Sequence, residues 1–131
     1  MDDIDVSFPG GKRIHAQVGE YLIQTDQPSR YGGEASAPAP FDLFLASLAT
    51  CAGIFAWNFC DSRKLPTEGL ALRMHCDEDE KGRMIQQILF TLTLPKDFPD
   101  RYRDGIVRAM ELCTVKRHLQ IAPEFRIEIE P

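Results

Sequence analysis

The sequence predicts an α+β domain with a mainly antiparallel sheet, in the element order βββ-α-ββ-α-β. Three observations indicate this class. Short segments of alternating apolar residues occur in runs, two longer segments have helical character, and Gly- and Pro-rich stretches separate them. The chain has 131 residues, of which 44% are hydrophobic, and this suits a domain of ordinary size with its own core. We therefore expect residues 1–131 to form a single domain.

The segment from Met1 to Thr25 is expected to form three short strands. Its apolar residues are Ile4, Val6 and Phe8, then Ile14, Ala16 and Val18, then Tyr21, Leu22 and Ile23. Pro9-Gly10-Gly11 and Gly19 mark the turns between them. The next stretch, from Thr25 to Pro40, is rich in Gly, Pro and Ser and indicates a long loop, which in a compact domain is often functional.

A long helix is predicted from Pro40 to about Arg63, because proline suits the first turn of a helix. The run Leu43–Cys60 has no charged residue, so the helix is apolar on every side. The run just reaches the lower limit of transmembrane length. Small and polar residues interrupt it and no basic cluster flanks it, so we expect a core helix and no membrane partner. One small sheet cannot cover such a helix, and we therefore predict a homodimer that buries it between subunits.

Three later segments have the pattern of strands. Alternation over Leu70–Cys76 and the apolar segment Ile85–Leu94 predict a hairpin with Gly82 in its turn. Near the end of the chain, Phe125, Ile127 and Ile129 alternate with charged residues and predict a final strand.

The second helix is predicted between these strands, from Pro99 to about Leu119. Its apolar stripe comprises Tyr102, Ile106, Met110 and Cys113, at spacings that bring them to one face of a helix.

Composition excludes several function classes. The net charge is -5 and there is no basic stripe, which argues against a nucleic-acid partner. The start, MDDIDVSF, lacks the basic and apolar regions of a secretory signal, so we expect a cytoplasmic protein whose thiols stay reduced. The three histidines are scattered and the four cysteines form no CxxC pair, so we expect no metal cofactor.

The cysteines are the candidate reactive groups. Cys51 lies mid-helix, where a free cysteine is commonly a small packing residue, and Cys60 lies on the opposite face, so we expect it to pack. Cys76 is followed by two carboxylates, which disfavour a thiolate, and is expected to be inert. Cys113 precedes a run of basic residues, which favour a thiolate, whereas a helix C-terminus would oppose it. The residues alone leave Cys51 and Cys113 open between packing and reactivity.

Two segments decide between these interpretations. The segment from Pro40 to Ala52, PFDLFLASLATCA, resembles the first-cysteine helix of the OsmC/Ohr family, the osmotically inducible and organic-hydroperoxide-resistance proteins. The segment from Glu111 to Arg117, ELCTVKR, resembles its second-cysteine helix. The spacing of Cys51 and Cys113 along the chain, the element order and the Gly-rich loop Tyr31–Glu34 match as well. The resemblance covers nearly the whole chain and is to the divergent OsmC-like branch.

The resemblance implies a thiol-dependent peroxidase that reduces organic hydroperoxides as an intertwined homodimer, with no metal or flavin. Cys51 would be the attacking thiolate and would be oxidised to a sulfenic acid. Cys113 would then close a disulfide with it, and a dithiol would reduce that disulfide. A buried thiol is mostly protonated at neutral pH, so this chemistry calls for a cation beside Cys51.

In the family this cation is an arginine from the N-terminal strands, held by a glutamate at the start of the first helix. Arg13, which follows a Gly-Gly turn, is the nearest match, and Lys12 and Arg30 are alternatives. Phe41 occupies the glutamate's position. Asp42, the next residue, is the candidate carboxylate, turned by about 100° around the helix.

A second departure lies beside the other cysteine. The proline that often follows the second cysteine in the family is Thr114 here.

Two other functions are compatible with the sequence. The first is a non-catalytic dimer that binds an apolar ligand between its central helices, with a pocket lined by Phe41, Phe44, Phe55 and Trp57. It predicts no cation near Cys51 and a gap between the two sulfurs that is too wide to bridge. The second is a membrane-anchored protein held by the apolar helix.

Overall fold

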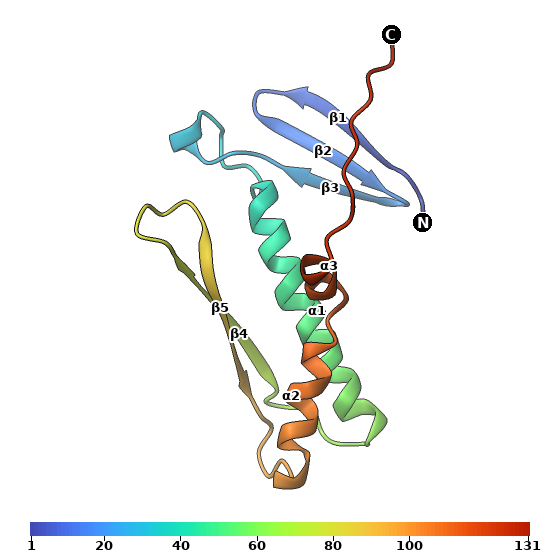
Figure 1. Ribbon diagram of the computed structural model, residues 1–131, viewed down its shortest axis with the longest axis vertical. Helices are drawn as coiled ribbons and strands as arrows, with labels where there is room; N and C mark the ends of the chain where they lie inside the picture. The colour runs from blue at the N-terminus through green and yellow to red at the C-terminus, as the bar shows by residue number, and fades with distance from the viewer. The chain divides into compact units, whose positions relative to one another are not determined.

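The computed structural model describes residues 1–131 and confirms the α+β class (Figure 1). It contains two small antiparallel sheets, with strand orders β1-β2-β3 and β4-β5. The chain divides into two compact units, Met1–Ala46 and Ser47–Pro131. Each unit is built from its own stretch of sequence, and the long helix α1 belongs in part to both.

The sheet of the first unit is a three-stranded meander. It comprises β1 (Ile4–Gly10), β2 (Arg13–Val18) and β3 (Tyr21–Thr25). Val6 pairs with Ala16, and Ala16 pairs with Ile23, so the alternating apolar residues share one register. Gly10 and Gly11 have φ values of 138° and 62°, which favour glycine at this turn. The three predicted strands are confirmed.

The loop between β3 and α1 is organised around a buried carboxylate. Asp26 accepts hydrogen bonds from the Gln27 N–H at 2.7 Å and from the N–H and hydroxyl of Ser36 at 3.1 and 2.6 Å. These bonds, with the Ser36 hydroxyl foremost, lower the pKa of Asp26 to about 2 although burial opposes the shift. Gly33 packs so closely against the Gln27 carbonyl group that a Cβ there would overlap it. The loop, which includes the short helix η1 (Ser29–Tyr31), is therefore held by its own contacts.

Helix α1 (Pro40–Ser62) begins at the predicted proline. Asp42 accepts a hydrogen bond from the Ala39 N–H at 3.0 Å and so satisfies one of the donors at the helix start. Further along, the buried residues fall on one stripe: Leu48, Ala52, Ala56, Phe59 and Cys60. Ile54 and Trp57 on other faces are 51% and 43% exposed. By length and composition alone, α1 could also cross a membrane.

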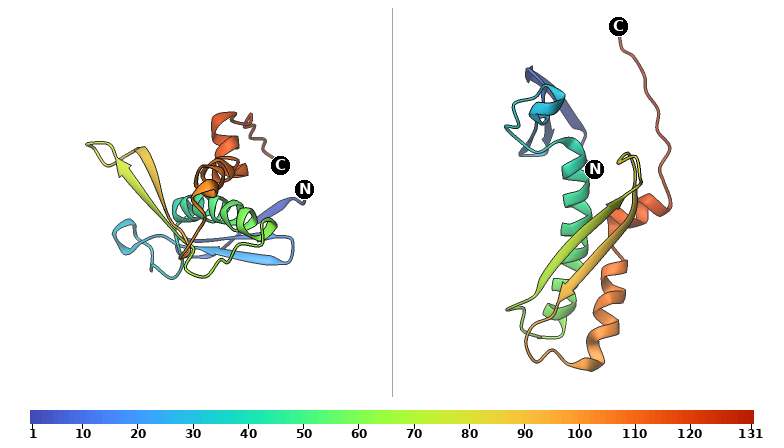
Figure 2. Two further views of the ribbon diagram at one scale, coloured as in Figure 1. Left: turned by 90° about the horizontal axis from the view of Figure 1, so that it is seen from below. Right: turned by 90° about the vertical axis from the view of Figure 1, so that its left-hand side faces the viewer.

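In the second unit, β4 (Ala71–Glu78) and β5 (Ile85–Thr93) form the predicted hairpin. Met74 pairs with Phe90 and Cys76 pairs with Ile88. In each strand, residues that are half-buried alternate with exposed ones, so the hairpin has one inner face. Figure 2 shows the hairpin running alongside α1, and Leu92 of β5 packs against the core residues of that helix.

The core of the second unit lies between α1 and α2 (Arg103–Glu111), which follows the short helix η2 (Asp100–Tyr102). Its buried residues are Ala56, Phe59, Cys60, Phe98 and Ile106. Gly105 lets the two helices approach, because a Cβ there would lie 3.0 Å from the Phe59 ring. Tyr102, Ile106 and Met110 face this core, as their spacing predicts.

The prediction of one helix from Pro99 to Leu119 is wrong in its second half. The helix ends at Glu111, and a separate helix, α3 (Thr114–Gln120), starts directly after Cys113. Cys113 itself has φ −46° and ψ 122°, which is not helical, and its sulfur accepts a hydrogen bond from the Lys116 N–H. Cys113 therefore caps α3 at its start.

The predicted final strand is also absent, because residues 122–131 form neither helix nor strand. A strand is held by backbone hydrogen bonds to a neighbouring strand, and no strand of this chain pairs with the segment. Phe125, Ile127 and Ile129 are 85%, 95% and 93% exposed in the single chain.

Candidate active site

The second unit brings Cys51 and Cys113 into contact although they lie far apart in the sequence. Cys51 is half-buried near the middle of α1, and Cys113 is buried between α2 and α3. The two thiols are joined by a hydrogen bond, and neither cysteine is part of a disulfide. The structure therefore places the two thiols as neighbours.

Backbone N–H groups at the start of α3 stabilise the thiolate of Cys51. Burial opposes its ionisation, but three hydrogen bonds outweigh burial and lower the pKa of Cys51. One comes from the Cys113 thiol and two from the backbone N–H groups of Val115 and Thr114. The more nucleophilic of the two sulfurs is therefore Cys51.

Cys113 has the opposite tendency. Burial raises the pKa of Cys113, and the hydrogen bond that it donates to Cys51 raises it further. Its sulfur also accepts from the Lys116 N–H, with an N···S distance of 3.5 Å. Cys113 is thus the protonated partner in this pair. Cys113 does not lie near the C-terminus of one long helix as predicted, since it precedes the first residue of α3, and burial is the main cause that opposes its ionisation.

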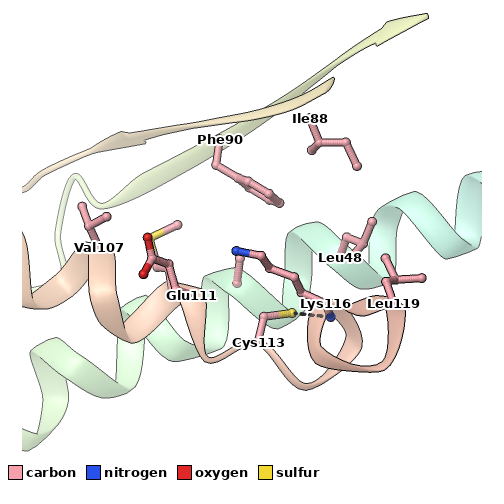
Figure 3. Close-up of a pocket in the computed structure, with 10 residues that line it drawn as sticks. Leu48, Ile88, Phe90, Val107, Glu111, Cys113, Lys116 and Leu119 are labelled. Carbon is pink, nitrogen blue, oxygen red and sulfur yellow. Dashed lines mark hydrogen bonds between the residues drawn. The ribbon is translucent and has the colours of Figure 1, made fainter. Parts of the chain in front are cut away.

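A cavity of about 370 Å³ lies beside Cys113, between α1, β5, α2 and α3 (Figure 3). Most of its lining is apolar: Leu48, Ala52, Ile88, Phe90, Val107, Met110 and Leu119. The polar members are Glu111, Cys113 and Lys116. Figure 3 shows the side chain of Lys116 extending from α3 into the cavity, with its nitrogen on the side of the cavity where Glu111 lies. The cavity thus combines apolar walls with one thiol, one carboxylate and one ammonium group.

The other two predicted site residues belong to the first unit. Arg13 is exposed and its Nε donates to the Gly10 carbonyl at 3.2 Å. Asp42 caps its own helix through the Ala39 N–H. No ion pair joins the two. Of the alternative cations, Arg30 stacks over the Tyr31 ring at 5.0 Å.

The remaining cysteines lie apart from the pair. Cys60 is fully buried in the core between α1 and α2, which confirms its predicted packing role, and burial raises its pKa. Cys76 is half-buried on the inner face of β4, opposite Ile88.

The sequence matches a family model, described as OsmC-like protein, over residues 33–128. The chain belongs to the OsmC family. The matched region includes Asp42, Cys51 and Cys113, and leaves Arg13 outside it. No curated protein matches the chain in sequence.

Solved structures confirm the OsmC-like fold. The OsmC like protein from Mycoplasma pneumoniae superposes with a TM-score of 0.70 at 16% identity, covering 92% of this chain and 87% of that one. A protein of Psychrobacter arcticus 273-4, described as an osmotic stress induced and detoxification response protein, gives 0.74 at 20% identity, covering 89% and 87%. An organic hydroperoxide resistance protein OsmC from Legionella pneumophila gives 0.57 at 16% identity, covering 92% and 90%.

Sequence reasoning missed the main source of thiolate stabilisation in this OsmC-family chain. The sequence predicts a cation that lowers the pKa of Cys51. In the structure, hydrogen bonds from the Cys113 thiol and from the N–H groups of Thr114 and Val115 lower it instead. The one available signal lies in the family resemblance and not in the residues of this chain. A proline common at the position of Thr114 suits the first turn of a helix, and so marks the start of a new helix after Cys113.

Proposed function

We propose that this OsmC-family protein is a thiol peroxidase that reduces organic hydroperoxides, with Cys51 as the attacking group and Cys113 as its disulfide partner. The observation that carries the proposal is the hydrogen bond between the two thiols, with Cys51 favoured as thiolate and Cys113 as thiol. The name of the Legionella pneumophila neighbour, an organic hydroperoxide resistance protein, supports the choice of substrate.

The oxidising half of the reaction follows from this division of roles. The Cys51 thiolate attacks the terminal oxygen of the hydroperoxide, the O–O bond breaks, and the alkoxide takes a proton from solvent to leave as the alcohol. Cys51 then carries a sulfenic acid. The Cys113 sulfur attacks the Cys51 sulfur and loses its proton, hydroxide leaves with that proton as water, and a disulfide remains. The chemistry needs no metal or flavin, because the two sulfurs supply both electrons.

A dithiol reductant returns the pair to its starting state by thiol–disulfide exchange. The two electrons pass from the dithiol to the two cysteines. Reduced thiols of this kind are maintained in the cytoplasm, which is where we place the protein.

Arg13 and Asp42 are proposed as auxiliary groups of the site, on the strength of the family resemblance. A guanidinium beside Cys51 would add to the hydrogen bonds that already favour its thiolate. Arg13→Ala, compared with Lys12→Ala and Arg30→Ala, tests which cation contributes. The expected result is a slower alkylation of Cys51 at neutral pH in Arg13→Ala alone.

We further propose that the two units of each chain act as one domain within a homodimer. The exposed apolar residues of α1 and of the C-terminal segment, such as Trp57 and Ile127, are surfaces that a second copy would cover. Burial of α1 between subunits would also leave no apolar helix available for a membrane.

The decisive experiment is the intact mass of the reduced protein after one equivalent of cumene hydroperoxide. Wild type should lose two hydrogens, Cys113→Ser should retain one oxygen, and Cys51→Ser should remain unchanged. Cys60→Ser and Cys76→Ser are matched controls and should behave as wild type. If the wild-type protein does not consume the hydroperoxide, the proposal is wrong.

The competing apolar-ligand function predicts sulfurs that are too far apart to bridge. The thiol–thiol hydrogen bond favours the peroxidase over this alternative. The alternative also expects a pocket lined by Phe41, Phe44, Phe55 and Trp57, and none of these residues lines the cavity beside Cys113.

A further inference from the structure

The cavity in the second unit reaches only one of the two reactive sulfurs. Cys113 is part of its lining and Cys51 is not. The walls near Cys113 come from β5, through Ile88 and Phe90, and from α3, through Lys116 and Leu119. Its volume of about 370 Å³ lies in the range of small-molecule sites.

We propose that this cavity is the docking site of the dithiol reductant, and that the reductant attacks the Cys113 sulfur rather than the Cys51 sulfur. The inference rests on the proposed function, because it concerns the disulfide that the peroxidase cycle forms. It specifies which of the two sulfurs the reductant attacks first, and the family resemblance does not imply this.

The leaving group supports this regiochemistry. Attack on Cys113 breaks the S–S bond so that its electron pair stays on Cys51. The N–H groups of Thr114 and Val115 donate to the Cys51 sulfur, and the resulting low pKa makes Cys51 the better leaving thiolate. Attack on Cys51 would instead expel Cys113, whose pKa is raised by burial.

The cavity also suits the incoming group. The ammonium of the half-buried Lys116 points into the cavity and would favour the thiolate form of a bound thiol, whereas the carboxylate of Glu111, which also lines the cavity but is exposed to solvent, opposes it. The apolar walls favour an uncharged small dithiol over a highly charged peptide thiol, since burying charge without a partner is costly.

The exchange then proceeds in two balanced steps. The reductant's thiolate bonds to the Cys113 sulfur, the Cys113–Cys51 bond breaks, and Cys51 leaves as a thiolate. The second thiol of the reductant then attacks the reductant's own sulfur, the mixed disulfide breaks, and its proton passes to Cys113. The dithiol leaves as a disulfide, having supplied two electrons.

The regiochemistry can be read in wild-type protein by trapping the mixed disulfide. The Cys51–Cys113 disulfide is first closed with diamide, so no hydroperoxide is involved. It is then treated briefly with benzyl mercaptan, quenched in acid, alkylated with N-ethylmaleimide and mapped by peptide mass. We expect the benzylthio group on Cys113 and the maleimide on Cys51, in about tenfold excess over the reverse, which corresponds to a barrier difference of about 1.4 kcal/mol.

A larger yield of the adduct on Cys51 would overturn the inference. If diamide closes no disulfide between the two cysteines, both the inference and the proposed function fail. If diamide closes it and cumene hydroperoxide does not, the proposed function fails alone.

The docking site is tested with two neighbouring residues of β5. Ile88 faces the cavity and Leu89 faces away, with 53% exposure. Ile88→Phe narrows the cavity and should slow reduction of the disulfide by dithiothreitol about tenfold, whereas Leu89→Phe should reduce at the wild-type rate. Equal rates in the two variants would place the reductant elsewhere.

Discussion

Thr114 supplies a backbone N–H at the position where the family resemblance implies a proline after the second cysteine. The Thr114 N–H donates to the Cys51 sulfur, and Thr114 is the first residue of α3. Proline is tolerated at that position in a helix but has no N–H to donate. Thr114→Pro should therefore leave α3 intact and raise the pKa of Cys51, so that iodoacetamide alkylates Cys51 severalfold more slowly at neutral pH.

The matched variant is Thr114→Ala, which removes the hydroxyl and keeps the N–H. Its rate of alkylation against pH should overlie that of wild type. If Thr114→Pro gave the same curve, the backbone hydrogen bond would not contribute to the reactivity of Cys51.

Asp26 is the basis of a second prediction at the residue scale, on how the stability of the protein depends on pH. Its folded pKa, about 2, lies below the ordinary value of 3.8 for this side chain. A depressed pKa contributes stability above the unfolded value, and that contribution is lost as the pH falls from about 4 toward 2. In urea denaturation between pH 5 and 2, Asp26→Asn should lose less stability than wild type over this window. Parallel curves would contradict the role given to Asp26.

At the scale of elements, α2 is held close to α1 by a glycine. A Cβ at Gly105 would lie 3.0 Å from the Phe59 ring. The ring has little freedom to shift, because the Arg63 guanidinium lies over it at 3.6 Å and Tyr102 packs edge-on at 5.9 Å. We expect Gly105→Ala to destabilise the protein by about 1 kcal/mol in urea denaturation, although alanine is the better helix former.

The Phe59→Leu background provides the control for Gly105→Ala. With the ring removed, the alanine should be neutral or stabilising, because only its helix propensity remains. A loss of stability that persisted in this background would exclude the ring as its cause.

The strands and the start of α1 could be predicted because their causes are local. Alternation predicts β1, β2 and β4, short apolar segments predict β3 and β5, and Pro40 suits the first turn of a helix. The end of α2 and the start of α3 at Cys113 could not be predicted, since this chain has no glycine or proline there. This break is stabilised by the Cys113 side chain at the start of α3, beside the sulfur of Cys51, which comes from a distant part of the sequence. Likewise, the contact between the two thiols depends on how α1, α2 and α3 pack, and the spacing of apolar residues in the sequence does not predict that packing.

The predicted final strand shows what sequence alternation cannot predict at the scale of the whole molecule. The alternation of Phe125, Ile127 and Ile129 identifies an apolar face, but it does not say which chain supplies the neighbouring strand. The single chain leaves all three side chains more than four-fifths exposed. This is the pattern expected of a strand that pairs only with a second copy.

The C-terminal segment therefore yields a prediction about assembly. Replacing Phe125, Ile127 and Ile129 together by Ser removes the apolar face. Each such side chain contributes about 1.5 kcal/mol or more when buried. The dimer dissociation constant should accordingly rise about a thousandfold or more, as measured by sedimentation equilibrium.

The matched variant replaces Arg126, Glu128 and Glu130 by Ser, on the alternate face, and should remain dimeric at the concentration where the apolar variant dissociates. If the two variants dissociated alike, the segment would not pair through its apolar face, and a monomeric wild type would exclude the homodimer itself.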